Sequence, residues 1–331
     1  MLLCRRAWLD VWRGRVPYGG EPVHGVVRPP LRTWARSALA PRNRLLPGLG
    51  ERLGRHPRLA AAVLVCLRHV PGAPRHVSRP LIQRMATRLE LPVSTGFRIQ
   101  VDTAEPMGRV LATSGIWEPH VTAAFRALLS PGDVCVDVGA YIGYYTLLAA
   151  DLVGPQGYVY ALEPAAEAYA ELVANLELNG LANVMALRVA GGAAKGEVVF
   201  DDRTQGQAMR SSVAQDGTAV PVRSVASLVP ASEFERLRLV KIDVEGYELE
   251  VLRGVEPIFE TGACPAVLVE LHTGVLREAV VLLAEFAARY GLTLHVLADG
   301  SPNDPAPWRG TAIELAHSLE SQHERHVLLV P

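Results

Sequence analysis

Acidic residues stand at the ends of apolar, strand-like runs in this chain, and their positions predict a ligand site. The run 134–136 leads into Asp137, and a second run, 158–162, ends at Glu163. A glycine-bearing turn lies between them, and Gly143 opens an apolar helical segment. Strand, turn, helix, strand and acid is the layout of a dinucleotide-type βαβ unit, whose glycines let a ligand approach the backbone.

The turn itself reads Asp137-x-Gly139-x-x-x-Gly143, with Tyr141 at its centre, so it lacks the glycines of the nicotinamide fingerprint G-x-G-x-x-G. An acid at the strand end would repel a diphosphate but would pair with the ammonium group of an amino-acid tail. Glu163, 20 residues after Gly143, is placed to accept both hydroxyls of a ribose. The pattern favours a nucleoside cofactor without phosphates, such as S-adenosylmethionine. The alternatives are a turn without a ligand and a helix-capping role for Glu163.

A second group of ionisable residues follows two later runs. Lys241 and Asp243 share one strand face, as do Glu270 and His272, and Glu245 follows closely. If the two strands are neighbours, these acids and the imidazole converge at one sheet edge. An imidazole with a pKa near 6.5 can take the proton that an attacking hydroxyl loses, so His272 is the preferred general base.

Asp243 or Glu245 would then orient His272 or bind the substrate hydroxyl. A hard-cation site that binds Mg²⁺ and acidifies the hydroxyl is an alternative. Two plainer interpretations also stay open: an ion pair between Lys241 and Asp243, and a loop or helix-capping histidine at position 272. His317, His323 and His326 match no metal-ligand spacing.

The elements that would position these residues alternate along the chain. The strands are predicted at 134–138, 158–162, 183–190, 239–243, 266–270, 292–297 and 326–330. Helical patterns separate them, at 165–179, 248–252, 275–290 and 312–318. This alternation predicts an α/β fold with a doubly wound, mostly parallel sheet, whose ligands lie beyond the carboxyl ends of the strands.

Three divisions of the chain are predicted: an irregular Arg/Pro/Gly-rich arm at 1–56, a helical and hairpin extension at 57–115, and the ligand-binding domain at 116–331. In the extension we expect two short helices, 57–70 and 78–90, and a strand at 96–102 paired with 109–112. A helix is predicted at 117–129. The polar segment 201–217 is expected to form a mobile loop near the pocket mouth.

Four segments of the chain resemble the FkbM-type methyltransferases. They are DVGAYIGYYT at 137–146, LEP at 162–164, NLELN at 175–179 and VKIDVEGYELEVLRG at 240–254. The resemblance covers about residues 114–290. It implies a Rossmann-like class I, S-adenosylmethionine-dependent fold with an antiparallel last strand, and methyl transfer to a hydroxyl of a sugar, glycan or natural product. Tyr141 departs from the family's frequent asparagine, and Ala226 from its frequent aspartate. Residues 1–110 match nothing in the family.

The composition is that of a globular protein, with 331 residues, 49% hydrophobic, 20% charged and a net charge of −1. Residues 1–90 hold 17 arginines and four acids, a balance that would suit contact with nucleic acid, an anionic membrane surface or an acidic partner. Because the chain has only two lysines, a compositional bias toward arginine is the favoured interpretation. Four scattered cysteines favour a reducing, cytoplasmic setting. The first residues do not resemble a signal peptide, and the apolar run 59–67 is too short for a span of about 20 residues.

The sequence therefore predicts an S-adenosylmethionine-dependent O-methyltransferase acting on a hydroxylated small-molecule or glycan acceptor, without a resident metal. A non-catalytic cofactor-binding partner protein is the alternative, and a nucleotide-dependent oxidoreductase is disfavoured by the missing glycines. The predicted cofactor-binding residues are Asp137, Gly139, Ala140, Tyr141, Gly143, Glu163, Pro164, Ala190 and Asp243. The predicted catalytic residues are Lys241, Asp243, Glu245, Glu270 and His272.

Overall fold

The computed structural model describes residues 53–68, 82, 88–200, 218–272, 276–297, 308–320 and 326–331. Chain contacts divide the protein into two compact units, of which one contains Val16–Trp117 and the other Glu118–Pro331. Most of the predicted arm at 1–56 and the predicted loop at 201–217 lie outside the described residues. The division at 56 and 115 stays a prediction.

The unit beginning at Glu118 is built on a seven-stranded sheet. Its strands are β3 (Val134–Val138), β4 (Tyr158–Leu162), β5 (Val184–Leu187), β9 (Leu237–Ile242), β10 (Ala266–Glu270), β11 (Thr293–Leu297) and β12 (His326–Val330). Their order in the sheet is β11-β12-β10-β9-β3-β4-β5. Only β12 runs antiparallel to its neighbours. The predicted doubly wound, mostly parallel sheet with an antiparallel last strand is confirmed.

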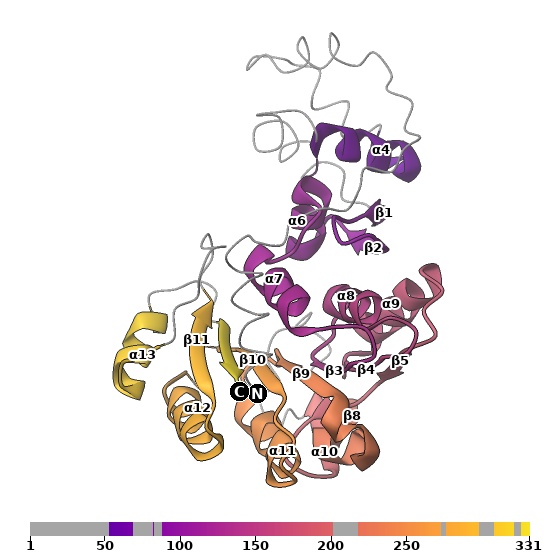
Figure 1. Cartoon of the computed structure of the whole chain (residues 1–331). Helices are drawn as coiled ribbons and strands as arrows, with labels where there is room; N and C mark the ends of the chain where they lie inside the picture. The colour runs from indigo at the N-terminus through magenta and orange to yellow at the C-terminus, as the bar shows by residue number, and fades with distance from the viewer. Residues whose placement is uncertain are drawn as a thin grey trace. The chain divides into compact units, whose positions relative to one another are not determined.

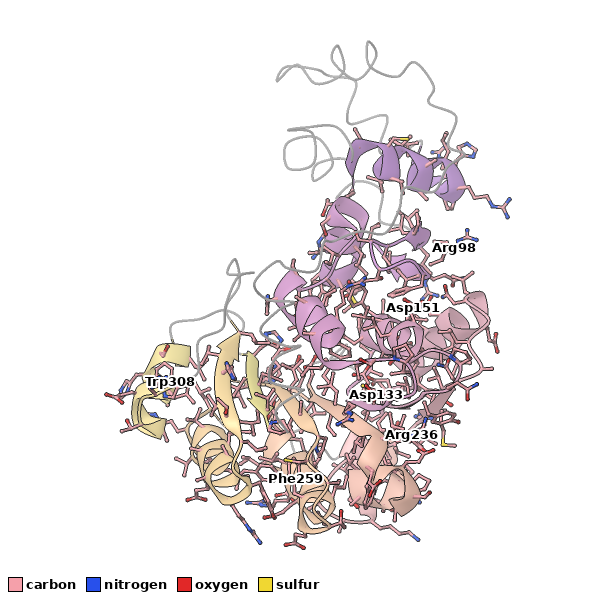
Figure 2. The ribbon with its side chains drawn as sticks, viewed as in Figure 1. Arg98, Asp133, Asp151, Arg236, Phe259 and Trp308 are labelled. Carbon is pink, nitrogen blue, oxygen red and sulfur yellow. The ribbon has the colours of Figure 1, made fainter. Side chains whose placement is uncertain are left out.

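Helices cover both faces of this sheet (Figure 1). One face carries α7 (Pro119–Leu128), α8 (Tyr144–Val153) and α9 (Ala166–Leu178). The other carries α10 (Val225–Leu228), α11 (Glu248–Glu260) and α12 (Leu276–Tyr290), and α13 (Ala312–Glu320) packs against α12. The aromatic ring of Phe259, labelled in Figure 2, lies 4.8 Å from that of Phe286 and joins α11 to α12. The amphipathic patterns in the sequence correspond to these packed faces.

Strand alternation separates an apolar core from a polar face. Val134, Val136 and Val138 of β3 lie in the hydrophobic core that includes the buried side chains of α11 and α12. Because successive side chains of a strand point to opposite faces, Cys135 and Asp137 project toward the α8 side. The hydrogen bond from Thr146 of α8 to Asp137 agrees with this assignment. The polar face is the one that carries the candidate site.

A small second sheet has the order β6-β8-β7 and follows β5 in the chain. It is formed by β6 (Ala190–Gly191), β7 (Gly196–Phe200) and β8 (Thr218–Arg223). The single strand predicted at 183–190 is therefore wrong in its second half, because β5 ends at Leu187 and Ala190 pairs with Val222 of β8 instead. After β8, the 3₁₀ helix η3 (Ala231–Arg236) precedes β9, and Arg236 (Figure 2) donates hydrogen bonds to the Gly132 carbonyl before β3.

The other unit contains α4 (Pro57–Arg68), the strands β1 (Arg88–Pro92) and β2 (Arg98–Asp102), and α6 (Pro106–Ser114). The predicted hairpin partner of β2 is wrong, since 109–112 lie in α6, where Pro106 suits the first turn of a helix. The end of the predicted helix 78–90 is also wrong, because β1 begins at Arg88 and pairs antiparallel with β2. Alternating burial of Leu89 and Leu91 explains the strand.

Among the described helices, none has both the length and the apolar character needed to cross a membrane.

Candidate active site

Strand register gathers charged residues on the α7/α8 face of the sheet. Asp137 of β3 pairs in register with Lys241 of β9, and Glu270 of β10 pairs with His326 of β12. Leu268 of β10 lies beside Lys241, so Glu270, two residues further on, projects from the same face. The predicted convergence of the β9 and β10 residues at one sheet edge is therefore present in the structure. His326 joins them because β12 is inserted next to β10.

Lys241 is the buried cation of this face. Its Nζ atom lies 3.1 Å from Asp243 Oδ2 and 3.6 Å from Asp137 Oδ1, and its side chain is only 4% exposed. Burial alone would lower the pKa of Lys241, but the charges of Asp243 and Asp137 outweigh burial and raise it. Burial likewise opposes the ionisation of Asp243, yet Lys241 and then His272 lower the pKa of that carboxyl. The ion pair between Lys241 and Asp243, an alternative left open by the sequence, is present.

Asp137 is enclosed by protein. It is fully buried, and its Oδ2 atom accepts a 2.7 Å hydrogen bond from the Thr146 hydroxyl. Burial raises its pKa, against the opposing effects of Lys241 and the Thr146 hydrogen bond. The predicted pairing of Asp137 with the ammonium group of a ligand finds no support in this geometry, because Lys241 already supplies the cation.

The turn after β3 is held against the end of β4. The N–H groups of Gly139 and Ala140 both donate to the Leu162 carbonyl, at 2.9 and 3.0 Å. A Cβ atom added to Gly139 would lie 1.7 Å from the Asp243 carbonyl oxygen, and Gly139 has a φ of +81°. Only glycine fits this position, for both reasons. The close approach joins the turn to Asp243, the residue that follows β9.

Glu163 faces the same turn from the end of β4. Its two carboxylate oxygens accept hydrogen bonds from the N–H groups of Tyr141 (2.8 Å) and Ala165 (2.9 Å). Burial raises the pKa of Glu163 to about 7, although both hydrogen bonds act to lower it. Each carboxylate oxygen has two lone pairs, so Glu163 keeps acceptor capacity for ribose hydroxyls beyond its bonds to the N–H groups of Tyr141 and Ala165.

The remaining predicted cofactor residues lie around this turn. Gly143 is the residue before α8, and Pro164 follows Glu163 and accepts a hydrogen bond from Arg188 through its carbonyl oxygen. Ala190 is buried in β6. A Cβ atom on the adjacent Gly191 would lie 2.5 Å from a side-chain carbon of Val138, so β6 abuts the end of β3. These residues therefore lie near the carboxyl ends of β3 and β4, and their role in cofactor binding stays a prediction.

His272 is surrounded by three glutamates. Its Nδ1 atom lies 2.6 Å from Glu248 Oε1, and its Nε2 atom lies 3.2 Å from Glu245 Oε2 and 3.9 Å from Glu270 Oε1. Burial alone would lower the pKa of His272, but the hydrogen bonds to Glu245 and Glu248 raise it to about 11. The imidazole is therefore charged at neutral pH, and a charged imidazole cannot accept a proton. This geometry argues against His272 as the general base.

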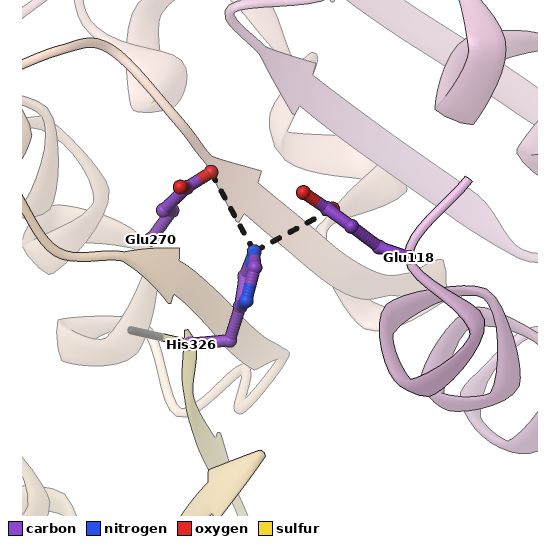
Figure 3. A group of neighbouring side chains, drawn as sticks. All are labelled: Glu118, Glu270 and His326. Atoms are coloured by element: carbon purple, nitrogen blue, oxygen red, sulfur yellow. Dashed lines mark ion pairs between the residues drawn. The ribbon is translucent and has the colours of Figure 1, made fainter. Parts of the chain in front are cut away.

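His326 occupies a second cluster with Glu270 and Glu118 (Figure 3). Its Nε2 atom lies 3.5 Å from Glu270 Oε2 and 3.6 Å from Glu118 Oε2. Glu118 precedes α7, and burial raises the pKa of its carboxyl to about 7 against the lowering effect of His326. His326 is 1% exposed. Glu270 thus lies between the two histidine clusters.

Backbone strain marks the same region. The described residues include three non-glycine residues with a left-handed φ, namely Glu118 (36°), Tyr141 (51°) and Glu245 (53°). Each belongs to one of the groups above. Left-handed backbone costs a non-glycine residue roughly 1–2 kcal/mol and clusters at functional sites. Asparagine tolerates it better than tyrosine, which accounts physically for the family's frequent asparagine at position 141.

Sequence reasoning missed Glu118 and Glu248 in these clusters, and it set His326 aside because its spacing matches no metal-ligand motif. Glu248 lies within the segment 240–254 that carries the family resemblance, but its proximity to His272 depends on how α11 packs and has no signal in the sequence. Glu118 and His326 had no local signal, because the sequence around each reads as an ordinary helix start and an ordinary strand.

Comparisons with known proteins find similarity to methyltransferases. Residues 137–288 match the model of the methyltransferase FkbM domain. The hexuronic acid methyltransferase AglP of Haloferax volcanii is 27% identical over 190 residues, which span 57% of this chain and 76% of AglP. Protein-L-isoaspartate O-methyltransferase of Ignicoccus hospitalis is 36% identical over 88 residues, spanning 26% of this chain and 40% of that protein.

Solved structures that match this chain include a methyltransferase FkbM from Methylobacillus flagellatus KT, with 14% identity and a TM-score of 0.42. The match covers 67% of this chain and 52% of the crystallised one, so this chain spans about half the length of that protein. A SAM dependent methyltransferase from Aquifex aeolicus matches with 13% identity and a TM-score of 0.37, over 68% of this chain and 93% of that one.

The strand order, the antiparallel β12 and the glycine turn between β3 and α8 define a Rossmann-like class I fold, and the chain is an S-adenosylmethionine-dependent methyltransferase. Residues 137–288, which match the model of the methyltransferase FkbM domain, include the glycine turn and Glu163.

Proposed function

We propose that this enzyme methylates a hydroxyl group of a sugar, glycan or natural-product acceptor, and that a uronic-acid-containing glycan is the first acceptor class to test. The observation that carries the proposal is the convergence of carboxylates around His272 at the sheet edge next to the glycine turn. The similarity to AglP, a hexuronic acid methyltransferase, supports the acceptor class.

The residues around the turn fit S-adenosylmethionine. Glu163 would accept the ribose hydroxyls, and the backbone of the turn from Gly139 to Gly143 would face the rest of the cofactor. When bound, the cofactor supplies a methyl group activated by a sulfonium. Asp137 contributes by fixing Lys241, which in turn holds Asp243 at the end of β9.

Proton removal is assigned to Glu245 rather than to His272. The side chain of Glu245 is 42% exposed, whereas those of Glu248 and Glu270 are 2% and 21% exposed. Glu245 would accept the proton that the acceptor hydroxyl gives up when its oxygen takes the methyl group. His272, held by Glu248, positions the Glu245 carboxylate through its Nε2 atom.

Two further predictions accompany this proposal. The scattered cysteines favour a reducing, cytoplasmic location, and the described cysteines are free thiols. The arginine distribution predicts that nucleic acid is not a partner.

The proposal is tested by incubating the full chain with methyl-labelled S-adenosylmethionine and matched neutral and uronic-acid glycosides. We expect acceptor-dependent formation of S-adenosylhomocysteine, with kcat lowered at least about 100-fold in Glu245→Gln. The variant Glu250→Gln is the matched control, because Glu250 lies on α11 and pairs with Arg253. If labelled product forms at equal rates with Glu245→Gln and Glu250→Gln, the assignment of the base is wrong.

A further inference from the structure

We propose that Glu118, Glu270 and His326 form a binding site for a divalent transition-metal ion, adjacent to the methyl-transfer site. The three side chains come from three elements: the residue before α7, the end of β10 and the start of β12. They lie within one compact unit and point toward one another (Figure 3). Each offers one ligand atom, and the three atoms lie within 4.8 Å of one another.

The Nε2 atom of His326 gives the strongest reason for a ligand. It is buried, it points between the two carboxylates, and among the described residues it has no hydrogen-bond partner. Its distances of 3.5 Å to Glu270 and 3.6 Å to Glu118 exceed the roughly 2.7–2.9 Å of a charge-assisted hydrogen bond. They are close to the separation of about 3.3–3.5 Å between two ligands that each bind one tetrahedral ion at about 2.0–2.1 Å.

The surrounding contacts orient the proposed ligands. The Nδ1 atom of His326 lies 3.1 Å from His120 Nε2, and the Tyr145 hydroxyl donates a 2.6 Å hydrogen bond to Glu118 Oε2. In the tautomer whose Nδ1–H donates to His120, the Nε2 lone pair of His326 faces the space between the glutamates, and a bound ion would take the place of the Nε2 proton that the two carboxylates otherwise favour by raising the pKa of His326 against burial. Metal-binding histidines commonly donate the other ring N–H in this way, which fixes the tautomer and the ring orientation.

The donor set selects the class of ion. Two carboxylates and an imidazole suit Zn²⁺, Mn²⁺ or Co²⁺, whereas Mg²⁺ and Ca²⁺ prefer ligand sets of oxygen alone. Three protein ligands leave at least one position for water or substrate. The side chain of Glu270 is 21% exposed, which gives the ion a route of entry.

The neighbouring group of Asp243, Glu245 and His272 also brings three candidate ligand atoms together. It suits an ion less well, because both ring nitrogens of His272 lie within hydrogen-bond distance of a glutamate. The group of Asp243, Glu245 and His272 is the cation site that the sequence offered as an alternative. The geometry favours the cluster of Glu118, Glu270 and His326 as the metal site instead. The consequence for catalysis rests on the proposed function: the open position would bind an oxygen of the acceptor next to Glu245.

The test measures metal binding in the full chain without acceptor. After chelation with EDTA and dialysis, the chain is titrated with CoCl₂ and ZnCl₂, with MgCl₂ for comparison, by calorimetry and by Co²⁺ absorption. We expect one Co²⁺ or Zn²⁺ per chain and at least about tenfold weaker Mg²⁺ binding. His326→Gln and Glu270→Gln should each weaken Co²⁺ binding at least about tenfold, whereas Glu245→Gln should leave it unchanged.

Circular dichroism and S-adenosylhomocysteine affinity show which variants remain folded. If His326→Gln does not fold, Glu270→Gln tests the site, because it is a conservative change at a partly exposed residue. Absence of stoichiometric Co²⁺ and Zn²⁺ binding would overturn the site. So would binding that survives His326→Gln and Glu270→Gln but is lost in Glu245→Gln. Metal binding without methyl transfer would instead contradict the proposed function, and full methyl transfer by a metal-free chain would contradict only the catalytic consequence.

Discussion

The Nζ atom of Lys241 lies 3.6 Å from Asp137 Oδ1, and both side chains are buried on the polar face of the sheet. The parallel register of β3 and β9 places the two residues opposite each other. The sequence suggested that Asp137 pairs with the ammonium group of a ligand. In the structure its carboxylate faces the ammonium group of Lys241 instead.

Removing that cation should destabilise the fold. Lys241→Met leaves the carboxylates of Asp137 and Asp243 without their buried partner, so we expect a loss of roughly 3–5 kcal/mol in the free energy of unfolding, measured by urea titration. The double variant Asp137→Asn/Lys241→Met should lose less than the sum of the single variants, because it also removes the unpaired charge. Additive losses would show that the two residues do not interact.

Cofactor binding should depend on pH through Glu163. Its pKa is raised to about 7, so the carboxylate is ionised above this pH and becomes protonated as the pH falls through it. If the ionised form accepts the ribose hydroxyls, S-adenosylhomocysteine should bind about tenfold more weakly at pH 6 than at pH 8. Calorimetry on Glu163→Gln should show weak binding that is independent of pH. An unchanged affinity in this variant would remove Glu163 from the pocket.

Gly139 should tolerate no side chain. In Gly139→Ala the new methyl group would overlap the Asp243 carbonyl, so we expect a loss of at least about 2 kcal/mol in stability or a failure to fold. Gly132→Ala is the matched control: Gly132 has a similar φ of +92°, but an added Cβ would meet nothing within 4 Å. It should show only the cost of the left-handed backbone, roughly 1–2 kcal/mol. Equal losses in thermal or urea unfolding would mean that the close approach to Asp243 is unimportant.

His272 should remain charged throughout the physiological range. With a pKa of about 11, its imidazole should show no titration between pH 6 and pH 9 in ¹⁵N NMR spectra, with the resonance assigned by its disappearance in His272→Gln. Glu248→Gln should lower this pKa, because it removes the charge 2.6 Å from Nδ1. A titration of His272 near pH 6.5 in the unmodified chain would restore it as a candidate base.

The βαβ unit was predictable because its features are local. The strand at 134–138, the glycines of the turn and Glu163 lie within 30 residues of one another, and their order alone indicates how they meet. The same holds for Lys241 and Asp243, whose spacing places them on one strand face.

The cluster at His326 was not predictable, because it depends on long-range arrangement. His326 reaches Glu270 only because β12 enters the sheet antiparallel next to β10, and it reaches Glu118 across 208 residues of chain. The charge state of His272 was missed for a related reason. Its pKa depends on Glu248, whose position follows from the start of α11 rather than from any strand.

Methyl transfer to a hydroxyl oxygen is tested most directly by the chemical stability of the product. The enzyme would be incubated with methyl-labelled S-adenosylmethionine and a uronic-acid-containing glycan, and the labelled glycan would then be treated with mild alkali before mass spectrometry. We predict that the label survives, as it does in an ether. Loss of the label as methanol would show a methyl ester formed on the carboxylate and would contradict the account.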